Sequence, residues 1–176
     1  MREFEPFKKI PRLSRECVIT EKIDGTNGQI CITEDGDFLV GSRNRWITPE
    51  NDNYGFARWA YENKDELMTL GVGHHFGEWW GQGIQRRYGI NEKRFSLFNV
   101  HRWEESRPSC CDVVPVLYKG VFSTEIVDKC IELLRISGSH AASGFNRPEG
   151  VIVYHVAAGS FFKKTLEKDE SPKGGK

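Results

Sequence analysis

The chain has 176 residues, enough for one domain with a sizeable core, and its hydrophobic and aromatic fractions of 38% and 12% are ordinary for a globular protein. Lys and Arg together number 25, as do Asp and Glu, so a globally basic surface is excluded and nucleic acid could be held only by a local patch. No apolar run reaches membrane-spanning length, and the five cysteines contain no Cys-x-x-Cys pair, so we expect a reduced, cytoplasmic protein without a disulfide framework or zinc site.

The first 16 residues are charged and contain two prolines, which predicts an extended arm packed on the surface. Two strand-favouring runs, 17–19 and 29–33, then flank the stretch Thr20-Glu21-Lys22-Ile23-Asp24-Gly25-Thr26-Asn27-Gly28. Its glycines allow a tight turn, so we expect Lys22 at a strand end with the next strand folding back beside it. Taken alone, the stretch is more typical of a solvated lysine before a hairpin.

Further along, residues 34–37 predict a hairpin turn and 38–40 a strand that ends in Gly41-Ser42-Arg43-Asn44-Arg45-Trp46. The hydrogen-bond donors on the serine, asparagine and arginine side chains of this stretch indicate a contact with an anion or a ribose, although a solvated polar loop has the same composition. Apolar residues at helical spacing predict a helix over 53–70. The glycine-rich residues 75–89 predict a strand to Glu78 or Trp79, followed by a structured loop whose tryptophans and arginines favour binding.

Residues 94–100 alternate as a strand, with Phe95 and Leu97 on one face and Ser96 and Phe98 on the other. We further predict strands over 113–118, 150–154 and 159–166, a helix over 123–137 that ends at Gly138, and a flexible polar tail over 167–176. The sequence therefore predicts one α+β domain over 1–166, with no OB or other C-terminal domain.

The expected strand ends supply the side chains that a nucleotide site needs. An aromatic ring stacks on the base, a carboxylate accepts hydrogen bonds from ribose hydroxyls, cations hold the phosphates, and a further carboxylate binds Mg²⁺. The motifs that carry these side chains, and their order along the chain, resemble those of the covalent nucleotidyltransferase superfamily of ATP-dependent ligases and capping enzymes. The resemblance is greatest to the RNA ligases that seal 3′-hydroxyl and 5′-phosphate ends (the T4 RNA ligase 2-like type), and it covers about residues 17 to 170.

The resemblance implies an α+β nucleotidyltransferase (ATP-grasp-like adenylation) domain with antiparallel sheets flanked by helices. It implies that Lys22, in Glu21-Lys22-Ile23-Asp24-Gly25, becomes adenylated, with Glu21 also at the cofactor. It assigns Arg43 to the ribose and the substrate end, Glu78 to the ribose, and Phe98 to stacking on adenine.

The resemblance also implies ATP and Mg²⁺ (or Mn²⁺) as cofactors. Glu149, in Glu149-Gly150-Val151-Ile152-Val153, and Asp24 would hold the metal. Lys163 would contact the α-phosphate, since only one of the adjacent Lys163 and Lys164 can face the site from a regular strand, and Lys164 would point outward. The three catalytic residues would be Lys22, Glu149 and Lys163.

RNA with 3′-OH and 5′-phosphate ends, such as a nicked duplex, is the implied substrate, with contacts from Asn27, Arg43, Arg86 and Arg87. A partner protein would replace the C-terminal domain that related ligases carry. An ε-amine attacks only when it is neutral, and its ordinary pKa is about 10.4, so neighbouring cations and partial burial are expected to disfavour the charged form of Lys22.

Two alternatives stay open. A DNA ligase or capping-type nucleotidyltransferase is favoured by Asp24, where this type of RNA ligase often has histidine, and disfavoured by Asn27 and the missing OB domain. A catalytically idle nucleotide- or RNA-binding module is disfavoured by the joint presence of Lys22, Glu149 and Lys163, because binding alone needs no nucleophile.

Overall fold

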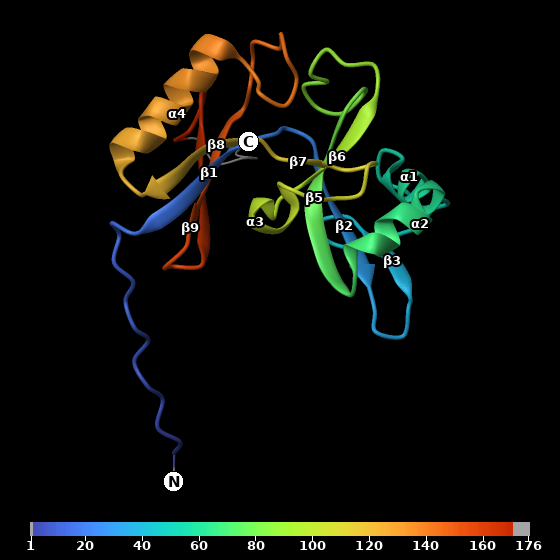
Figure 1. Cartoon of the computed structure of the whole chain (residues 1–176), viewed down its shortest axis with the longest axis horizontal. Coiled ribbons are helices and arrows are strands. Elements are labelled where there is room, and N and C mark those ends of the chain that lie inside the picture. The colour runs from blue at the N-terminus through green and yellow to red at the C-terminus, as the bar shows by residue number, and fades with distance from the viewer. Residues whose placement is uncertain (1, 171–176) are drawn as a thin grey trace.

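The computed structural model describes residues 2–170, which form two β-sheets side by side, each with helices on its outer face (Figure 1). The first sheet has the order β10-β9-β1-β8, with β1 Glu16–Lys22, β8 Val116–Val121, β9 Gly150–His155 and β10 Ser160–Thr165. The second has the order β4-β3-β2-β5-β6-β7, with β2 Thr26–Ile32, β3 Phe38–Gly41, β4 Trp46–Ile47, β5 Gly73–Gly81, β6 Lys93–Leu97 and β7 Asp112–Val113. Apart from the parallel pair β6 and β7, these strands pair antiparallel. The predicted mixture of helices with antiparallel sheets is confirmed.

Helix α4 (Thr124–Ser137) covers the outer face of the first sheet (Figure 1). The Ser123 side chain accepts a hydrogen bond from the Ile126 amide at 3.2 Å, and Gly138 ends the helix in the left-handed region at φ 77°. Its apolar side chains pack on those of β1 and β9 in one core cluster. The helix predicted over 123–137 is therefore confirmed.

The outer face of the second sheet is covered by α1 (Phe56–Glu62), α2 (Lys64–Leu67) and the 3₁₀ turn η1 (Met68–Leu70). The helical prediction for this segment holds, with a break at Asn63. Trp79 and Trp80 are only 2% and 1% exposed, so the prediction that these tryptophans belong to a binding loop is wrong. Both are core residues because β5 runs on to Gly81 and has apolar neighbours on both of its faces.

Residues 23–25 carry the chain from one sheet to the other. The expected hairpin after Lys22 is wrong, because β1 pairs with β8 and β9 whereas β2 pairs with β3 and β5. Ile23 packs with Trp80 and Tyr88 in a third cluster at this junction. A Cβ atom on Gly25 would lie 2.4 Å from the Trp79 carbonyl oxygen, so the crossing requires glycine there.

Two strands differ from their predicted lengths. The segment 94–100 forms β6 only as far as Leu97, because Asn99 then caps the short helix α3 (Val100–Trp103). Residues 113–118 divide between β7 and β8 around Pro115. Phe98 consequently lies just beyond a strand end.

At the N-terminus, residues 2–12 are exposed and extend away from the two sheets, so the prediction that this arm packs on the surface is wrong for them (Figure 1). The end of the arm is attached, because the Leu13 carbonyl oxygen lies 2.6 Å from His155 Nε2 and the Arg15 carbonyl oxygen accepts a hydrogen bond from the Phe122 amide at 2.9 Å. At the other end, Asp169 accepts a hydrogen bond from the Thr165 amide at 2.9 Å, so the first part of the expected flexible tail folds against β10. The remainder, 171–176, lies outside the described residues. All five cysteines are free, and no helix within residues 2–170 is long and apolar enough to cross a membrane.

Candidate active site

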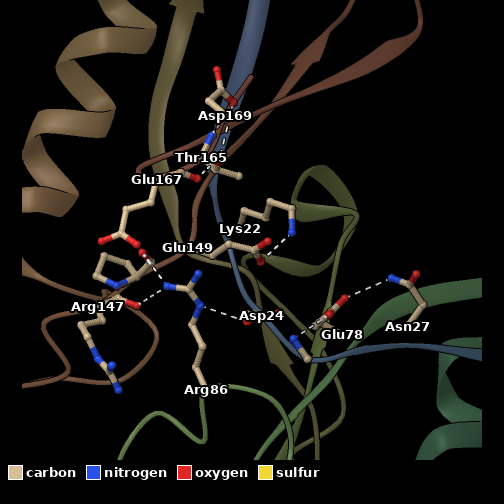
Figure 2. A network of polar contacts seen from close by, with 12 residues as sticks. Lys22, Asp24, Asn27, Glu78, Arg86, Arg147, Glu149, Thr165, Glu167 and Asp169 are labelled. Carbon is tan, nitrogen blue, oxygen red and sulfur yellow. Dashed lines mark hydrogen bonds and ion pairs between the residues drawn. The ribbon is translucent and has the colours of Figure 1, made fainter. Parts of the chain in front are cut away.

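Lys22 is the last residue of β1, and its ammonium group forms an ion pair with Glu149. The Lys22 Nζ to Glu149 Oε2 distance is 2.6 Å, and the side chains are 16% and 4% exposed (Figure 2). The contact follows from strand pairing, because Lys22 lies opposite Gly150 in the antiparallel pair of β1 and β9. A lysine and a carboxylate 127 positions apart in sequence are thus held together by two central strands.

Glu78, on β5, is a second buried carboxylate at this place. It accepts hydrogen bonds from the Gly25 amide at 3.0 Å and from Asn27 Nδ2 at 3.1 Å, since Asn27 lies opposite it on β2. Burial raises the pKa of Glu78 to about 7, although the Gly25 bond and the Lys22 charge both act to lower it. The carboxylates of Glu149 and Asp24 raise it further. Asn27, expected at the RNA, thus lies against the carboxylate expected at the ribose.

Asp24 and Arg86 were assigned separate roles by sequence, at the metal and at the RNA, but the structure pairs them. Arg86 Nε donates to Asp24 Oδ2 at 2.9 Å, and its Nη1 donates to the carbonyl oxygens of Arg147 at 2.9 Å and Pro148 at 3.3 Å (Figure 2). Arg86 therefore connects the crossing after Lys22 to the segment just before Glu149. One Asp24 oxygen and most of the guanidinium are already engaged.

Glu21 lies on the other face of the first sheet and is 1% exposed. Its carboxylate accepts hydrogen bonds from Ser139 Oγ at 2.6 Å and from the amides of His140 at 2.8 Å and Ala141 at 3.0 Å. Its expected cofactor role is therefore corrected: Glu21 anchors the segment that follows α4. Successive residues of a strand point to opposite faces, so Glu21 and Lys22 cannot share a site.

The same alternation separates the two lysines of β10. Lys163 pairs with Ile152, and Ile152 pairs with Thr20, which shares its face with Lys22. Lys164 pairs with Val151 and hence lies on the face of Glu21, where its Nζ is 2.6 Å from Asp128 Oδ1 on α4. Lys163 thus has the same orientation as the Lys22 side chain, and Lys164 has the opposite one.

The other predicted contacts lie on the surface around these groups. Arg43 is exposed in the turn between β3 and β4, and Arg87 is exposed in the loop after β5. Phe98 is 36% exposed, and its amide donates to the Phe76 carbonyl oxygen at 2.9 Å, which places it beside β5, two residues along the strand from Glu78.

Tyr88 is a residue that sequence reasoning missed. Its hydroxyl accepts a hydrogen bond from the Asp24 amide at 2.7 Å, and burial raises its pKa, so it remains protonated while it supports the crossing. Its left-handed backbone, at φ 52°, lies in a loop without periodicity, so no local signal marks its contact with a residue 64 positions away.

Glu149 is the residue best suited to a divalent cation. Residues 2–170 contain no group of three or more His, Cys, Asp or Glu side chains that could by itself hold a metal. Mg²⁺ usually binds one or two protein carboxylates and completes its shell with substrate phosphates and water. The buried Glu149 carboxylate fits that kind of site, whereas Asp24 is committed to Arg86.

The fold and these groups together define the class of protein. Two sheets are joined by residues 23–25, and at this junction Lys22 is ion-paired with Glu149, with Glu78 as a second buried carboxylate. More particularly, the chain belongs to the RNA ligase family, whose family model matches residues 15–165. None of the curated proteins compared with the chain matches it.

Solved structures of Naegleria gruberi RNA ligase share this fold. A mutant with ATP and Mn has a TM-score of 0.63 and 19% identity, over 90% of this chain and 52% of that one. A mutant with AMP and Mn has a TM-score of 0.64 and 19% identity, over 91% and 53% of the two chains. The chain thus spans about half the length of those proteins, and at this identity the likeness concerns the fold alone.

Proposed function

We propose that this protein is an ATP-dependent RNA ligase built on a nucleotidyltransferase (adenylation) domain. Membership of the RNA ligase family supports the reaction class. The observation that carries the assignment is the ion pair between Lys22 and the buried Glu149, with Glu78 beside it. A lysine held at a strand end against a buried carboxylate that can take its proton suits attack on a nucleotide phosphate better than passive binding.

In the first step, the neutral Lys22 amine attacks the α-phosphate of ATP. The bond from Nζ to phosphorus forms, the bond from the α-phosphorus to the bridging oxygen breaks, and pyrophosphate leaves with that electron pair and with the proton that the attacking nitrogen gives up. The proton that Lys22 loses beforehand passes by way of Glu149, which already contacts the ammonium at 2.6 Å. Lys163, on the same face, stabilises the negative charge that develops on the phosphate oxygens.

The remaining side chains orient the nucleotide. Glu78 in its charged form accepts hydrogen bonds from ribose hydroxyls, Arg43 contacts the ribose and the RNA end, and Phe98 stacks on adenine. A divalent cation such as Mg²⁺ or Mn²⁺ would be held at Glu149 after that carboxylate has passed on the proton, and it would supply further charge neutralisation on the phosphates. Naegleria gruberi RNA ligase mutants have been solved with ATP or AMP together with Mn, which supports this choice of cofactors.

Two transfers complete the reaction. A 5′-phosphate oxygen of RNA attacks the lysyl–AMP phosphorus, the phosphoramidate bond breaks, and the Lys22 amine is released. A 3′-hydroxyl then attacks the activated 5′-phosphate, loses its proton, and displaces AMP to close the strand. We also propose that the chain acts in the cytoplasm, and that a further domain or a partner protein contributes to holding the RNA.

The test is incubation with α-labelled ATP or GTP and Mg²⁺, followed by a denaturing gel. We expect label from ATP on the wild type and none on Lys22→Ala, whereas Lys164→Ala, which removes a lysine on the opposite face, retains the label. Label from GTP would instead indicate a capping-type enzyme. Absence of label from either nucleotide on folded protein would refute the ligase proposal and leave a binding module.

The acceptor needs a second experiment, because DNA ligases share the first step. Adenylated protein is offered nicked duplexes that differ only in whether the nicked strand is RNA or DNA. We expect sealing of RNA, in agreement with the family, and faster sealing of DNA would favour the alternative.

A further inference from the structure

A row of exposed aromatic residues crosses the second sheet next to the paired residues Asn27 and Glu78. On the face that carries Asn27 and Glu78, Phe76 pairs with Gln29, Gln29 with Gly41, and Gly41 with Trp46. Phe98 continues the row at the β6 end, where its amide bonds to Phe76. We call Trp46, Phe76 and Phe98, together with Gln29, which lies between Trp46 and Phe76, the aromatic row.

The rings of this row are exposed although the protein buries other large aromatics. Trp46 and Phe76 are 51% and 54% exposed, whereas Trp79, Trp80 and Phe95 are 2% exposed or less. Burying such a ring stabilises a fold, so several exposed rings on one sheet face indicate a binding surface. Proposed adenine stacking accounts for Phe98 alone and leaves Trp46 and Phe76 without a role.

A glycine lets Trp46 lie close to the sheet. A Cβ atom at Gly41 would lie 3.2 Å from Trp46 Cε3 and Cζ3 and 3.2 Å from Gln29 Oε1, so the indole lies over the Gly41 backbone and toward Gln29. The His74 ring, two residues before Phe76 on the same face, lies 6.1 Å from the Phe76 ring with the planes 12° apart, and it hydrogen-bonds to Gln29. At strand spacings of about 4.8 Å, the Trp46 and Phe76 backbones are roughly 14 Å apart.

Unpaired RNA is the occupant that these features fit. Exposed aromatic rings on a sheet face stack with splayed-out bases, and Gln and His side chains can meet base edges. The exposed Arg43 lies in the turn that joins Gly41 to Trp46, so a cation for the phosphate backbone is adjacent to the stacking surface. The proposed adenylate site at Glu78 borders the row directly.

We propose that Trp46 and Phe76 form a stacking surface for unpaired bases of the RNA strand whose end is joined at Lys22. This inference rests on the proposed ligase function and adds to it a site within this chain that binds the RNA substrate. Binding of RNA at this site does not depend on base identity, because every base has a face that can stack on an aromatic ring.

The test measures binding of a short, unpaired, fluorescently labelled RNA without a 5′-phosphate and in the absence of ATP, so that no chemistry occurs. We expect Trp46→Ala and Phe76→Ala each to weaken binding about tenfold, the effect of losing one stacked base. Trp46→Phe should recover most of the affinity, because it keeps a ring. Phe162→Ala is the matched control: Phe162 is 56% exposed but lies on the α4 face of the first sheet, so its loss should leave binding unchanged.

Two further measurements separate stacking from other effects. An RNA of equal length with abasic positions should bind the wild type and Trp46→Ala equally, since it keeps the phosphates and lacks the bases. Adenylation of Lys22 is measured in parallel on each variant. If wild type adenylates but Trp46→Ala and Phe76→Ala bind RNA normally, the stacking surface is refuted while the ligase proposal stands. If wild type does not adenylate, the ligase proposal is refuted whatever the RNA affinities are.

The role proposed for Phe76 can be refuted separately from that of Trp46. If Phe76→Ala abolishes adenylation while RNA binding is unchanged, Phe76 belongs to the nucleotide pocket and the assignment to RNA is overturned for that residue. An equal loss for intact and abasic RNA in Trp46→Ala would likewise overturn stacking, because a change that acts through phosphates does not require bases.

Discussion

Replacement of Glu78 by glutamine should change how stability depends on pH. The wild-type carboxyl has a pKa of about 7 in the folded protein, against an ordinary value of 4.5. Because the folded pKa is raised, the contribution of the protonated form to stability is fully present below about pH 4.5 and is lost as the pH rises through about 7. Glutamine has the shape of the protonated acid and does not titrate, and it keeps both contacts if Asn27 turns its amide so that its oxygen accepts from the new Nε2.

The size of the effect follows from the rise in pKa from 4.5 to about 7. At about 1.4 kcal/mol for each pH unit, Glu78→Gln should gain at most about 3 kcal/mol of unfolding free energy relative to wild type at pH 8. The assay is urea unfolding between about pH 5 and pH 8, without nucleotide or metal. The gain should be small at pH 5 and should grow with pH.

Glu66→Gln is the control for this experiment. Hydrogen bonds from Ser109 and Cys110 lower the pKa of Glu66, so its contribution is lost only as the pH falls below the ordinary range of a carboxyl group. Its difference from wild type should therefore be constant between pH 5 and pH 8. A constant difference for Glu78→Gln as well, or one that shrinks as the pH rises, would refute the reasoning that burial dominates at Glu78.

Three further predictions concern the same site. Lys163→Ala should slow formation of lysyl–AMP about 100-fold in a single-turnover label assay, whereas Lys164→Ala should not; equal effects would contradict the face assignment. Arg86→Ala should lower the unfolding free energy by about 1–3 kcal/mol in urea, because it leaves Asp24 and two carbonyls without their donor, and an unchanged midpoint would contradict that connection. Gly25→Ala should lower the free energy of unfolding by about 1–3 kcal/mol, because its Cβ atom would lie 2.4 Å from the Trp79 carbonyl oxygen. This loss is measured as a lower Tm, and an unchanged Tm would mean that residues 23–25 can shift to make room.

The order of elements could be read from local sequence. The cap at Ser123 and the stop at Gly138 define α4, because a hydroxyl cap and a left-handed glycine act within one helical turn. The positions of Lys22 at the end of β1 and of Glu149 directly before β9 were predicted in the same way, from short apolar runs bounded by glycines, whereas Glu78 lies within β5 and not at its end. Such signals depend on neighbours a few residues apart.

Pairing between distant strands could not be read in this way. The contacts of Lys22 with Glu149 and of Arg86 with Asp24 join residues far apart in the chain, and the crossing after Lys22 resembles a hairpin until β8 and β9 are seen to flank β1. Strand preference depends on what packs on each face, so sequence alone did not show that β5 is buried on both sides at Trp79 and Trp80.

By itself, then, the sequence determined which chemical groups occur and in what order along the strands, because hydrophobic alternation, caps and turn residues act locally. Only the tertiary structure decided which of those groups face one another. The register of β1 against β9 places Lys22 opposite Gly150 and thus beside Glu149, and the register across β4, β3, β2 and β5 aligns Trp46 with Phe76. A shift of one residue in either register would undo these placements, and the register is set by the packing of both whole sheets.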